Sequence, residues 1–213
     1  MKKILMAIAA LMMAATSFAQ TSSGSFSFDQ SRLYYGARLG LSAAGITDLD
    51  TKAGLTLAGV IGLRVSDTTP VFLESGLYFT QRGGKGDVKV GGATAKYDVS
   101  LNYLEIPVLI KYGIPVTDGV SVMPLIGPYF SWAIGGKTKE TVSAGGAEVV
   151  TKHSSFNDGY YKHPDMGIKV GCGAEYNNLY LELAYKFGIA NIANADNVTA
   201  HGHAFTVNFG VNF

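Results

Sequence analysis

The last ten residues, Ala204-Phe205-Thr206-Val207-Asn208-Phe209-Gly210-Val211-Asn212-Phe213, decide the fold of this chain. Every odd position from Phe205 to Phe213 is large and apolar, whereas the even positions are small or polar. Successive side chains of a β-strand point to opposite faces, so this period of two predicts a strand with one apolar and one polar face. The same alternation recurs seven times upstream and favours an all-β barrel.

The composition fits exported β-structure. Glycine and tyrosine are abundant, at 27 and 12 of 213 residues, and the mean hydropathy is positive. Without Lys2 and Lys3, the 17 basic residues become 15 against 16 acidic ones, which gives nucleic-acid binding no electrostatic support. The single cysteine, Cys172, excludes an internal disulfide, and we interpret it as a small apolar wall residue.

The first residues predict export. A basic start at Lys2 and Lys3 precedes the apolar stretch from Ile4 to Ala15, and Ser17-Phe18-Ala19 is a small-x-small cleavage site. The apolar stretch is shorter than the about 20 residues of a spanning helix, which favours a cleaved signal peptide over an anchor. The predicted divisions are residues 1–19 as signal peptide, 20–32 as periplasmic lead-in and 33–213 as outer-membrane barrel.

Eight segments long enough to cross a membrane as tilted strands are expected. They are residues 33–43, 53–65, 71–82, 99–112, 120–135, 165–176, 179–189 and 204–213. Short connections at 66–70, 113–119 and 177–178 alternate with longer ones, as in an up-and-down barrel with short periplasmic turns. The largest predicted outer loops are residues 83–98 and 136–164. Within the second, Gly145-Gly146 separates two strand-like runs, which predicts a projecting hairpin whose edge could recruit a partner strand.

The alternation sorts side chains into an apolar row and a row of charges and glycines. A soluble carrier barrel would turn the apolar row inward, so alternation alone leaves that alternative open. Eight strands enclose only enough room for side chains to fill, and rows such as Leu104, Ile106 and Val108 therefore fit better against lipid. Aromatic girdles are expected at the strand ends. They comprise Tyr34, Tyr35, Tyr112, Tyr176, Tyr180 and Phe213 toward the periplasm, and Phe79 and Trp132 toward the outside.

The charged row predicts an ion-pair network in the lumen. Its members are Arg38, Arg64, Glu74, Arg82, Glu105, Lys111, Lys169, Glu175, Glu182 and Lys186. Unpaired buried charges cost several kcal/mol, so we expect these groups to pair, with glycines between them giving space to the long side chains. A core filled in this way argues against an open porin.

Two segments and the last residue resemble those of a known family. The segment Tyr103-Leu104-Glu105-Ile106-Pro107-Val108-Leu109-Ile110-Lys111-Tyr112, followed by Gly127-Pro128-Tyr129-Phe130 and the final Phe213, resembles the PorT-like outer-membrane β-barrel domain of Bacteroidota. The resemblance implies an eight-stranded barrel that the barrel-assembly machinery inserts by reading the last strand. The named member of that family acts in type IX protein secretion, whereas most relatives have no assigned activity.

Candidate catalytic and metal-binding residues are weak. The histidines His153, His163, His201 and His203 fall on the presumed outer side, but their spacing matches no compact metal motif. His153-Ser154-Ser155 places a hydroxyl beside an imidazole without a visible orienting acid, so an acyl hydrolase is a minor alternative. Gly83-Gly84-Lys85-Gly86 lacks the ending of a phosphate loop. We expect no cofactor, no metal and no catalytic residue.

The sequence therefore predicts a small barrel in the outer membrane of a Gram-negative bacterium, with a plugged polar core. Its expected role is structural, or an interaction through its extracellular loops. The expected partners are outer-membrane lipid, the barrel-assembly machinery at Phe213 and an extracellular or secretion-system protein. The competing hypotheses are a narrow gated channel, an accessory component of type IX-like secretion and a lipid-modifying enzyme.

Overall fold

The computed structural model describes residues 32–46, 50–90, 93–144, 147–155, 162–192 and 200–213. The predicted signal peptide, and all of the predicted lead-in except Arg32, lie outside these residues. The described strands are β1 (Leu33–Ile46), β2 (Asp50–Arg64), β3 (Val71–Val90), β4 (Ala93–Tyr112), β5 (Ile114–Thr117), β6 (Val120–Ala144), β7 (Ala147–Ser154), β8 (Pro164–Tyr176), β9 (Leu179–Gly188) and β10 (Gly202–Asn212). In the described part of the chain, no helix is long and apolar enough to cross a membrane.

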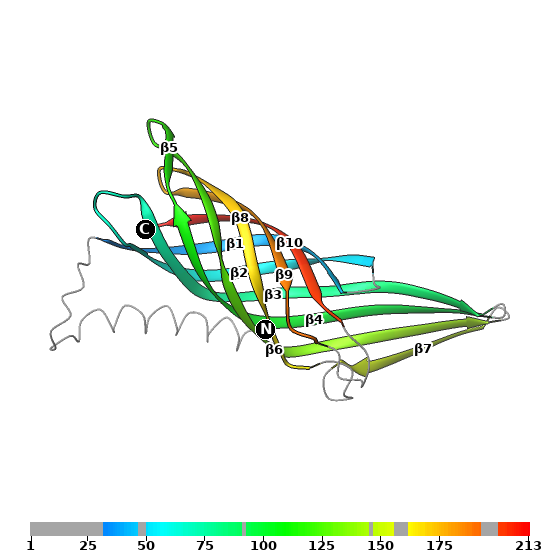
Figure 1. The fold of residues 1–213 in the computed structure, drawn as a ribbon. Helices are drawn as coiled ribbons and strands as arrows, with labels where there is room; N and C mark the ends of the chain where they lie inside the picture. The colour runs from blue at the N-terminus through cyan, green and yellow to red at the C-terminus, as the bar shows by residue number, and fades with distance from the viewer. Residues whose placement is uncertain (1–31, 47–49, 91–92, 145–146, 156–161, 193–199) are drawn as a thin grey trace.

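Eight of the ten described strands form a closed antiparallel ring (Figure 1). Hydrogen-bonded neighbours follow the order β4-β3-β2-β1-β10-β9-β8-β6, and β4 pairs with β6 to complete the circle. β5 forms a short hairpin with the start of β6, and β7 pairs with the far end of β6. The prediction of an eight-stranded up-and-down barrel is confirmed.

Short connections gather at one end of the ring, which we call the turn end. The turn between β8 and β9 consists of Asn177 and Asn178, and Asn177 adopts a φ of 52°. Two-residue hairpin turns need such a left-handed residue, and asparagine tolerates it well. Gly119, with a φ of 74°, meets the same requirement before β6. The three predicted short connections are therefore confirmed, but the connections between β1 and β2 and between β3 and β4 are also short, where longer ones were predicted.

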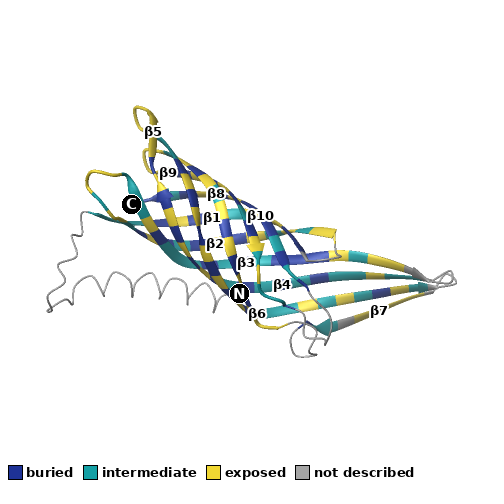
Figure 2. Cartoon of the chain, viewed as in Figure 1, coloured by how far each residue is buried: buried dark blue, intermediate teal, exposed yellow. Residues whose placement is uncertain are grey.

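Buried and exposed residues alternate along the strands of the ring (Figure 2). In β4, Glu105 and Lys111 are buried with exposed fractions of 0% and 1%, whereas Ile106 and Val108 expose 50% and 45%. Because neighbouring side chains of a strand point to opposite faces, one face of β4 lines the lumen and the other forms the outer wall. The predicted orientation of the two rows is confirmed, and the soluble carrier alternative is wrong.

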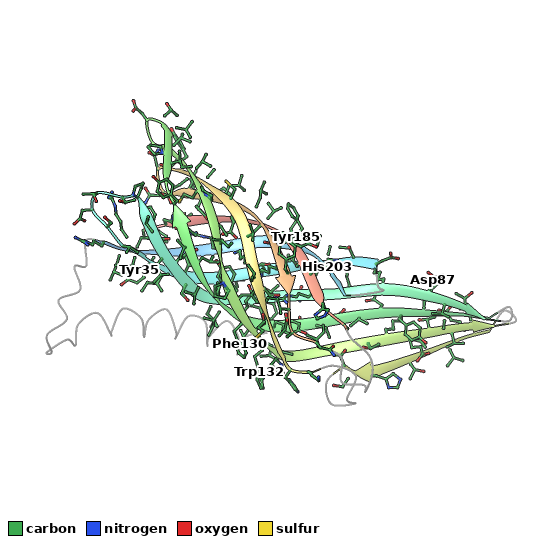
Figure 3. All side chains as sticks on the ribbon, viewed as in Figure 1. Tyr35, Asp87, Phe130, Trp132, Tyr185 and His203 are labelled. Atoms are coloured by element: carbon green, nitrogen blue, oxygen red, sulfur yellow. The ribbon has the colours of Figure 1, made fainter. Side chains whose placement is uncertain are left out.

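Large apolar side chains cover the outer wall. Phe130 and Trp132 of β6 point away from the barrel (Figure 3). Cys172 of β8 is exposed on the same wall, as predicted. Further exposed apolar residues on the ring include Leu39, Leu41, Leu55, Ile61, Leu73, Ile110, Ile126, Val170, Leu181, Leu183, Phe187, Phe205 and Phe209. A contiguous apolar surface of this extent fits hydrocarbon and not water.

The last strand closes the ring against the first. β10 pairs with β1 from Ile46↔Gly202 to Gly36↔Asn212, and with β9 on its other side. The register ends in a reciprocal pair, in which the Phe213 N–H donates to the Tyr35 carbonyl at 2.7 Å and the Tyr35 N–H donates to the Phe213 carbonyl at 3.1 Å. Phe213 itself exposes 74% of its surface at the turn end.

The two largest predicted loops are wrong, because most of residues 83–98 and 136–164 is strand. β3 and β4 stay paired as far as Val90↔Ala93, and β4 and β6 as far as Thr94↔Ser143. The predicted hairpin is confirmed, since β6 and β7 pair from Lys137↔Ser154 to Ala144↔Ala147. These four strands continue well beyond the rest of the ring (Figure 1). We call residues 86–90, 93–101, 136–144 and 147–154 the projecting sheet.

Two members of the predicted aromatic girdle lie inside the barrel instead. Tyr180 exposes only 1% of its surface, and the Tyr34 hydroxyl donates to Glu74 Oε2 at 2.7 Å. Both belong to the lumen-facing parity of their strands, which overrides their position near a strand end. Tyr112 and Tyr176, by contrast, expose 45% and 55% of their surface on the outer wall, as a girdle requires.

Candidate functional site

Charged side chains from five strands fill the lumen and form ion pairs. Toward the end that carries the projecting sheet, Glu105 of β4 holds two cations. Its Oε1 lies 2.6 Å from Lys186 Nζ of β9, and its Oε2 contacts Arg82 Nη2 of β3. Arg82 Nη1 also lies 2.6 Å from Asp165 Oδ2 of β8, and the Ser131 hydroxyl donates to Glu105 Oε2 at 3.3 Å. In this group, the carboxylates of Glu105 and Asp165 therefore share the cations of Arg82 and Lys186.

A second group lies toward the turn end and centres on Glu74 of β3. Lys111 Nζ lies 2.7 Å from Glu74 Oε1, and Arg38 Nη2 lies 3.4 Å from Glu74 Oε2. The Tyr34 hydroxyl donates to the same Oε2, and Arg38 Nη2 also donates to Asn212 Oδ1 at 2.6 Å. Both carboxylate oxygens of Glu74 are thus held by cations or a hydroxyl.

Tyr180 connects this group to a third pair. Its hydroxyl accepts from Lys111 Nζ at 2.8 Å and donates to Glu182 Oε2 at 3.3 Å. Glu182 Oε1 lies 2.6 Å from Lys169 Nζ and accepts from Asn208 Nδ2 at 2.9 Å. We call the buried charges the lumen network. They are Arg38, Arg82, Lys111, Lys169 and Lys186, and Glu74, Glu105, Asp165 and Glu182.

Tyrosine rings give the cations of the network a second kind of partner. The Arg38 guanidinium lies 4.2 Å from the centre of the Tyr180 ring, and Lys111 Nζ lies 4.3 Å from the same centre. Arg82 lies 5.0 Å from the ring centre of Tyr103. Such contacts contribute about 0.5–2 kcal/mol each when desolvated, so the aromatic residues help to offset the cost of burying the cations.

Glycines provide the space that these long side chains occupy. A Cβ added to Gly36 would lie 2.6 Å from Arg38 Nη1, and one added to Gly210 would lie 2.5 Å from Arg38 Cδ. At Gly173, an added Cβ would lie 2.7 Å from the Tyr180 ring. A side chain at any of these positions would displace Arg38 or Tyr180, which gives the predicted alternation of glycine and charge a steric cause.

Two of the predicted network residues lie outside the buried pairs. Arg64 is exposed at the end of β2, where its Nε donates to the Ser66 carbonyl at 3.1 Å. Glu175 is half-buried near the turn end and accepts from Asn212 Nδ2. Both residues occupy positions of their strands that alternate toward the lumen, but each lies near the end of its strand, outside the closed part of the ring. Their position along the strand therefore matters as much as parity.

Sequence reasoning missed several lumen residues that carry no net charge, and one that does. Asp165 is absent from the predicted network, although its parity in β8 matches that of Lys169 and places it in the lumen. Asn208 and Asn212 have the same signal in β10, where even positions face inward. Pairing of Arg82 with Asp165, 83 positions apart, has no signal in the sequence.

The histidines do not gather into a metal site. His163 Nδ1 lies 3.0 Å from the Ala133 carbonyl oxygen, and His201 Nδ1 lies 3.1 Å from that of Ala190. His203 stacks on Tyr185 with ring centres 6.4 Å apart (Figure 3), while His153 belongs to β7. In the residues that the structure describes, no group of three or more His, Cys, Asp or Glu side chains could hold a metal ion.

The two ends of the lumen differ. At the turn end a cavity of about 250 Å³ opens between β1, β3 and β9, with Tyr34, Phe72 and Tyr180 in its wall. At the other end a cluster of buried apolar residues covers the lumen network. Its members are Val99, Leu101, Tyr103, Ala133, Ile192 and Ala200. Ile192 is held in place by bonds of its N–H to the Ala200 carbonyl, at 3.0 Å, and of its carbonyl to the Lys162 N–H, at 2.8 Å.

Comparison with known proteins identifies the family. The sequence model of the family described as outer membrane protein beta-barrel domain matches residues 18–194. This chain belongs to that family. It is an outer-membrane protein of a Gram-negative bacterium, and its apolar outer wall is the surface that the membrane covers. A search among curated proteins finds no match.

Three solved structures with a similar fold are distant from this chain in sequence. Neisserial surface protein A (NspA) shares 17% identity at a TM-score of 0.44, with 85% of this chain and 97% of that chain covered. Ail, the attachment invasion locus protein of Yersinia pestis, shares 11% identity at a TM-score of 0.38, with 85% and 99% covered. The N-terminal barrel domain of Pseudomonas aeruginosa OprF shares 12% identity at 0.38, with 85% and 98% covered.

The lumen network predicts a position-dependent cost for neutralising a carboxylate. Glu105→Gln leaves Lys186 and Arg82 buried with less negative charge, so we expect the free energy of unfolding to fall by about 3 kcal/mol. Glu175→Gln, at the half-exposed rim, should cost less than about 1 kcal/mol. Denaturant unfolding of both variants in phospholipid vesicles measures the difference, and equal losses would contradict a paired, buried network.

Proposed function

We propose that this protein is a non-conducting outer-membrane barrel whose task is to hold the projecting sheet outside the cell as an interaction surface. Outer-membrane barrels have short periplasmic turns and longer extracellular segments. The turn end then faces the periplasm and the projecting sheet faces outward. The observation that carries the proposal is that β3, β4 and β6 are single strands running from the lumen network to the end of the sheet.

The core supports a plugged barrel. The lumen network occupies the middle of the ring, and its members expose at most 8% of their surface. The apolar cluster around Leu101 and Ile192 lies above it, so a hydrated ion would meet both a band of paired charges and an apolar layer. An open pore of the porin type needs many more strands to leave an aqueous channel.

The projecting sheet supports an interaction role. It exposes Val88, Val142, Val149 and Val150 with fractions of 37% to 62%, and these residues belong to strands beyond the lipid-facing wall. Its two outer strands, β3 and β7, have edges that a partner strand can extend. A four-stranded sheet rooted in a barrel is also a rigid platform, since its strands share their ladders with the ring.

No observation favours the competing roles. The buried carboxylates are held by cations, and His163 and His201 lie against backbone carbonyls, so we place no catalytic step on this chain. The narrower PorT-like resemblance, and the type IX secretion role that it implies, stay predictions. Insertion by the barrel-assembly machinery through Phe213 is likewise proposed from the pairing of the last strand with β1.

A plugged core predicts electrically silent membranes. Protein refolded in detergent, which should migrate anomalously on a gel until it is boiled, is added to a planar lipid bilayer under voltage. We expect no unitary current steps, because a lumen plugged by the proposed network offers ions no continuous aqueous path. Discrete, reproducible steps from the purified wild-type barrel would contradict the plugged core and favour the gated channel.

The interaction role predicts protein contacts at the sheet but not at the outer wall. A photo-crosslinking residue placed at Val149 on intact cells should form covalent adducts with protein, because this side chain exposes 62% of its surface on the projecting sheet. The same residue at Ile126, which is 54% exposed on the outer wall, is the matched control and should react with lipid only. Absence of protein adducts from Val149 would contradict the proposal.

A further inference from the structure

The free edge of β7 is the least protected part of the projecting sheet. β7 pairs with β6 and, in the described part of the chain, with no other strand. The Ser155 N–H donates to the Gly136 carbonyl at 3.3 Å, and bonded pairs alternate along an antiparallel ladder. Odd-numbered residues of β7 therefore bond to β6, and the even-numbered residues 148, 150 and 152 turn their N–H and C=O groups to the free edge.

The sequence of this edge is complementary to itself. It reads Glu148-Val149-Val150-Thr151-Lys152. If a second copy of the segment lies antiparallel to the first with Val150 opposite Val150, each Glu148 stands opposite a Lys152. The same register places residues 148, 150 and 152 of one copy opposite residues 152, 150 and 148 of the other. These are the residues whose backbone groups face the free edge. The same register therefore pairs opposite side-chain charges and allows backbone hydrogen bonds between the two strands.

Charges across the sheet favour the same neighbour. One row of cross-strand register partners runs Asp50↔Lys85, Lys85↔Asp98, Asp98↔Lys139 and Lys139↔Lys152. The signs alternate along this row until its last two members, which are both lysines. An acidic residue beside Lys152 restores the alternation, and in the antiparallel register that residue is Glu148 of the second copy.

We infer that β7 pairs with β7 of a second copy of this chain, in the register that places Glu148 opposite Lys152. The inference rests on the proposed function, since it names the partner of the projecting sheet. The contact is a two-fold symmetric extension of the sheet, in which the same residues serve both sides.

The direction of the strands places the two copies in different membranes. Antiparallel β7 strands are related by an axis normal to the sheet, which reverses the direction of the second projecting sheet. The barrels then lie at opposite ends, because β3, β4 and β6 each continue as one strand from barrel to sheet (Figure 1). In one membrane, both β7 strands would point the same way. The pairing therefore joins two membranes that face each other. Many copies can pair at once between such membranes, so a contact of only five residues per copy can hold them together.

Phosphatidylcholine vesicles that carry the full-length protein test this inference directly. Two vesicle populations with donor and acceptor dyes are mixed, and clustering is followed by energy transfer. Wild-type vesicles should cluster. Glu148→Lys vesicles and Lys152→Glu vesicles should each cluster about tenfold more slowly among themselves, because every cross-copy pair becomes a like-charge pair. Gel mobility before boiling verifies that each variant is a folded barrel.

Mixing the two single variants gives the decisive result. A Glu148→Lys strand carries lysine at both positions and a Lys152→Glu strand carries glutamate at both, so this mixture should cluster like wild type. Asp87→Lys changes the charge as much as Glu148→Lys does, but on the opposite edge of the sheet (Figure 3), and it should leave clustering unchanged. A merely structural effect of either variant would not be rescued by the other.

Two results would overturn the inference. One is the failure of wild-type vesicles to cluster, and the other is a mixture of the two variants that clusters no faster than each variant alone. If Val149 on intact cells then forms adducts with a different protein, the self-pairing is wrong and the proposed interaction role survives. If no adduct forms either, both are wrong.

Discussion

Pairing of buried charges inside a narrow tube is the constraint on which this structure depends. A strand that crosses a membrane turns alternate side chains to lipid and to the lumen, so an apolar outer wall commits the other row to the interior. In this chain that row contains nine buried charged side chains, and each makes at least one ion pair with another of them. Charges left alone there would cost more than the barrel gains from any single contact.

The same strands that carry the network also build the surface outside. Glu74 and Arg82 lie on β3, Glu105 and Lys111 lie on β4, and both strands continue into the projecting sheet. A base whose lumen is filled with paired charges therefore gives the sheet a fixed direction relative to the membrane. This is why a symmetric contact at the sheet edge implies facing membranes, and why the family's fold alone would not reveal it.

The barrel could be predicted from the sequence because lipid enforces the period of two. Rows such as Leu104, Ile106 and Val108 have no other arrangement in an eight-stranded tube, and the parity of Glu105 and Lys111 follows from them. Apart from the hairpin predicted at Gly145-Gly146, the projecting strands escaped prediction because lipid covers neither of their faces, so the apolar row that marks the other strands is absent. The glycines of residues 83–86 also interrupt the pattern at the point where β3 leaves the ring.

The partners within the lumen were beyond sequence reasoning for a different reason. Parity assigns Arg82 to the interior, but it does not say which carboxylate will meet it, since Glu105 and Asp165 come from strands separated by β6. Arg64 has the correct parity and still lies outside the buried pairs, because the strand ends there. Tyr180 is the opposite case. It was predicted to belong to the aromatic girdle, but its position in the alternation of β9 turns it into the lumen, where it contacts Lys111.

The orientation of the two rows can be measured on Trp132, the only tryptophan of the chain. It exposes 50% of its surface on the outer wall of β6, next to the buried Ser131 and Ala133. In vesicles of brominated phospholipid its fluorescence should be strongly quenched, while a soluble quencher such as iodide should have little effect. Efficient quenching by iodide with no effect of the brominated chains would contradict a lipid-facing apolar wall.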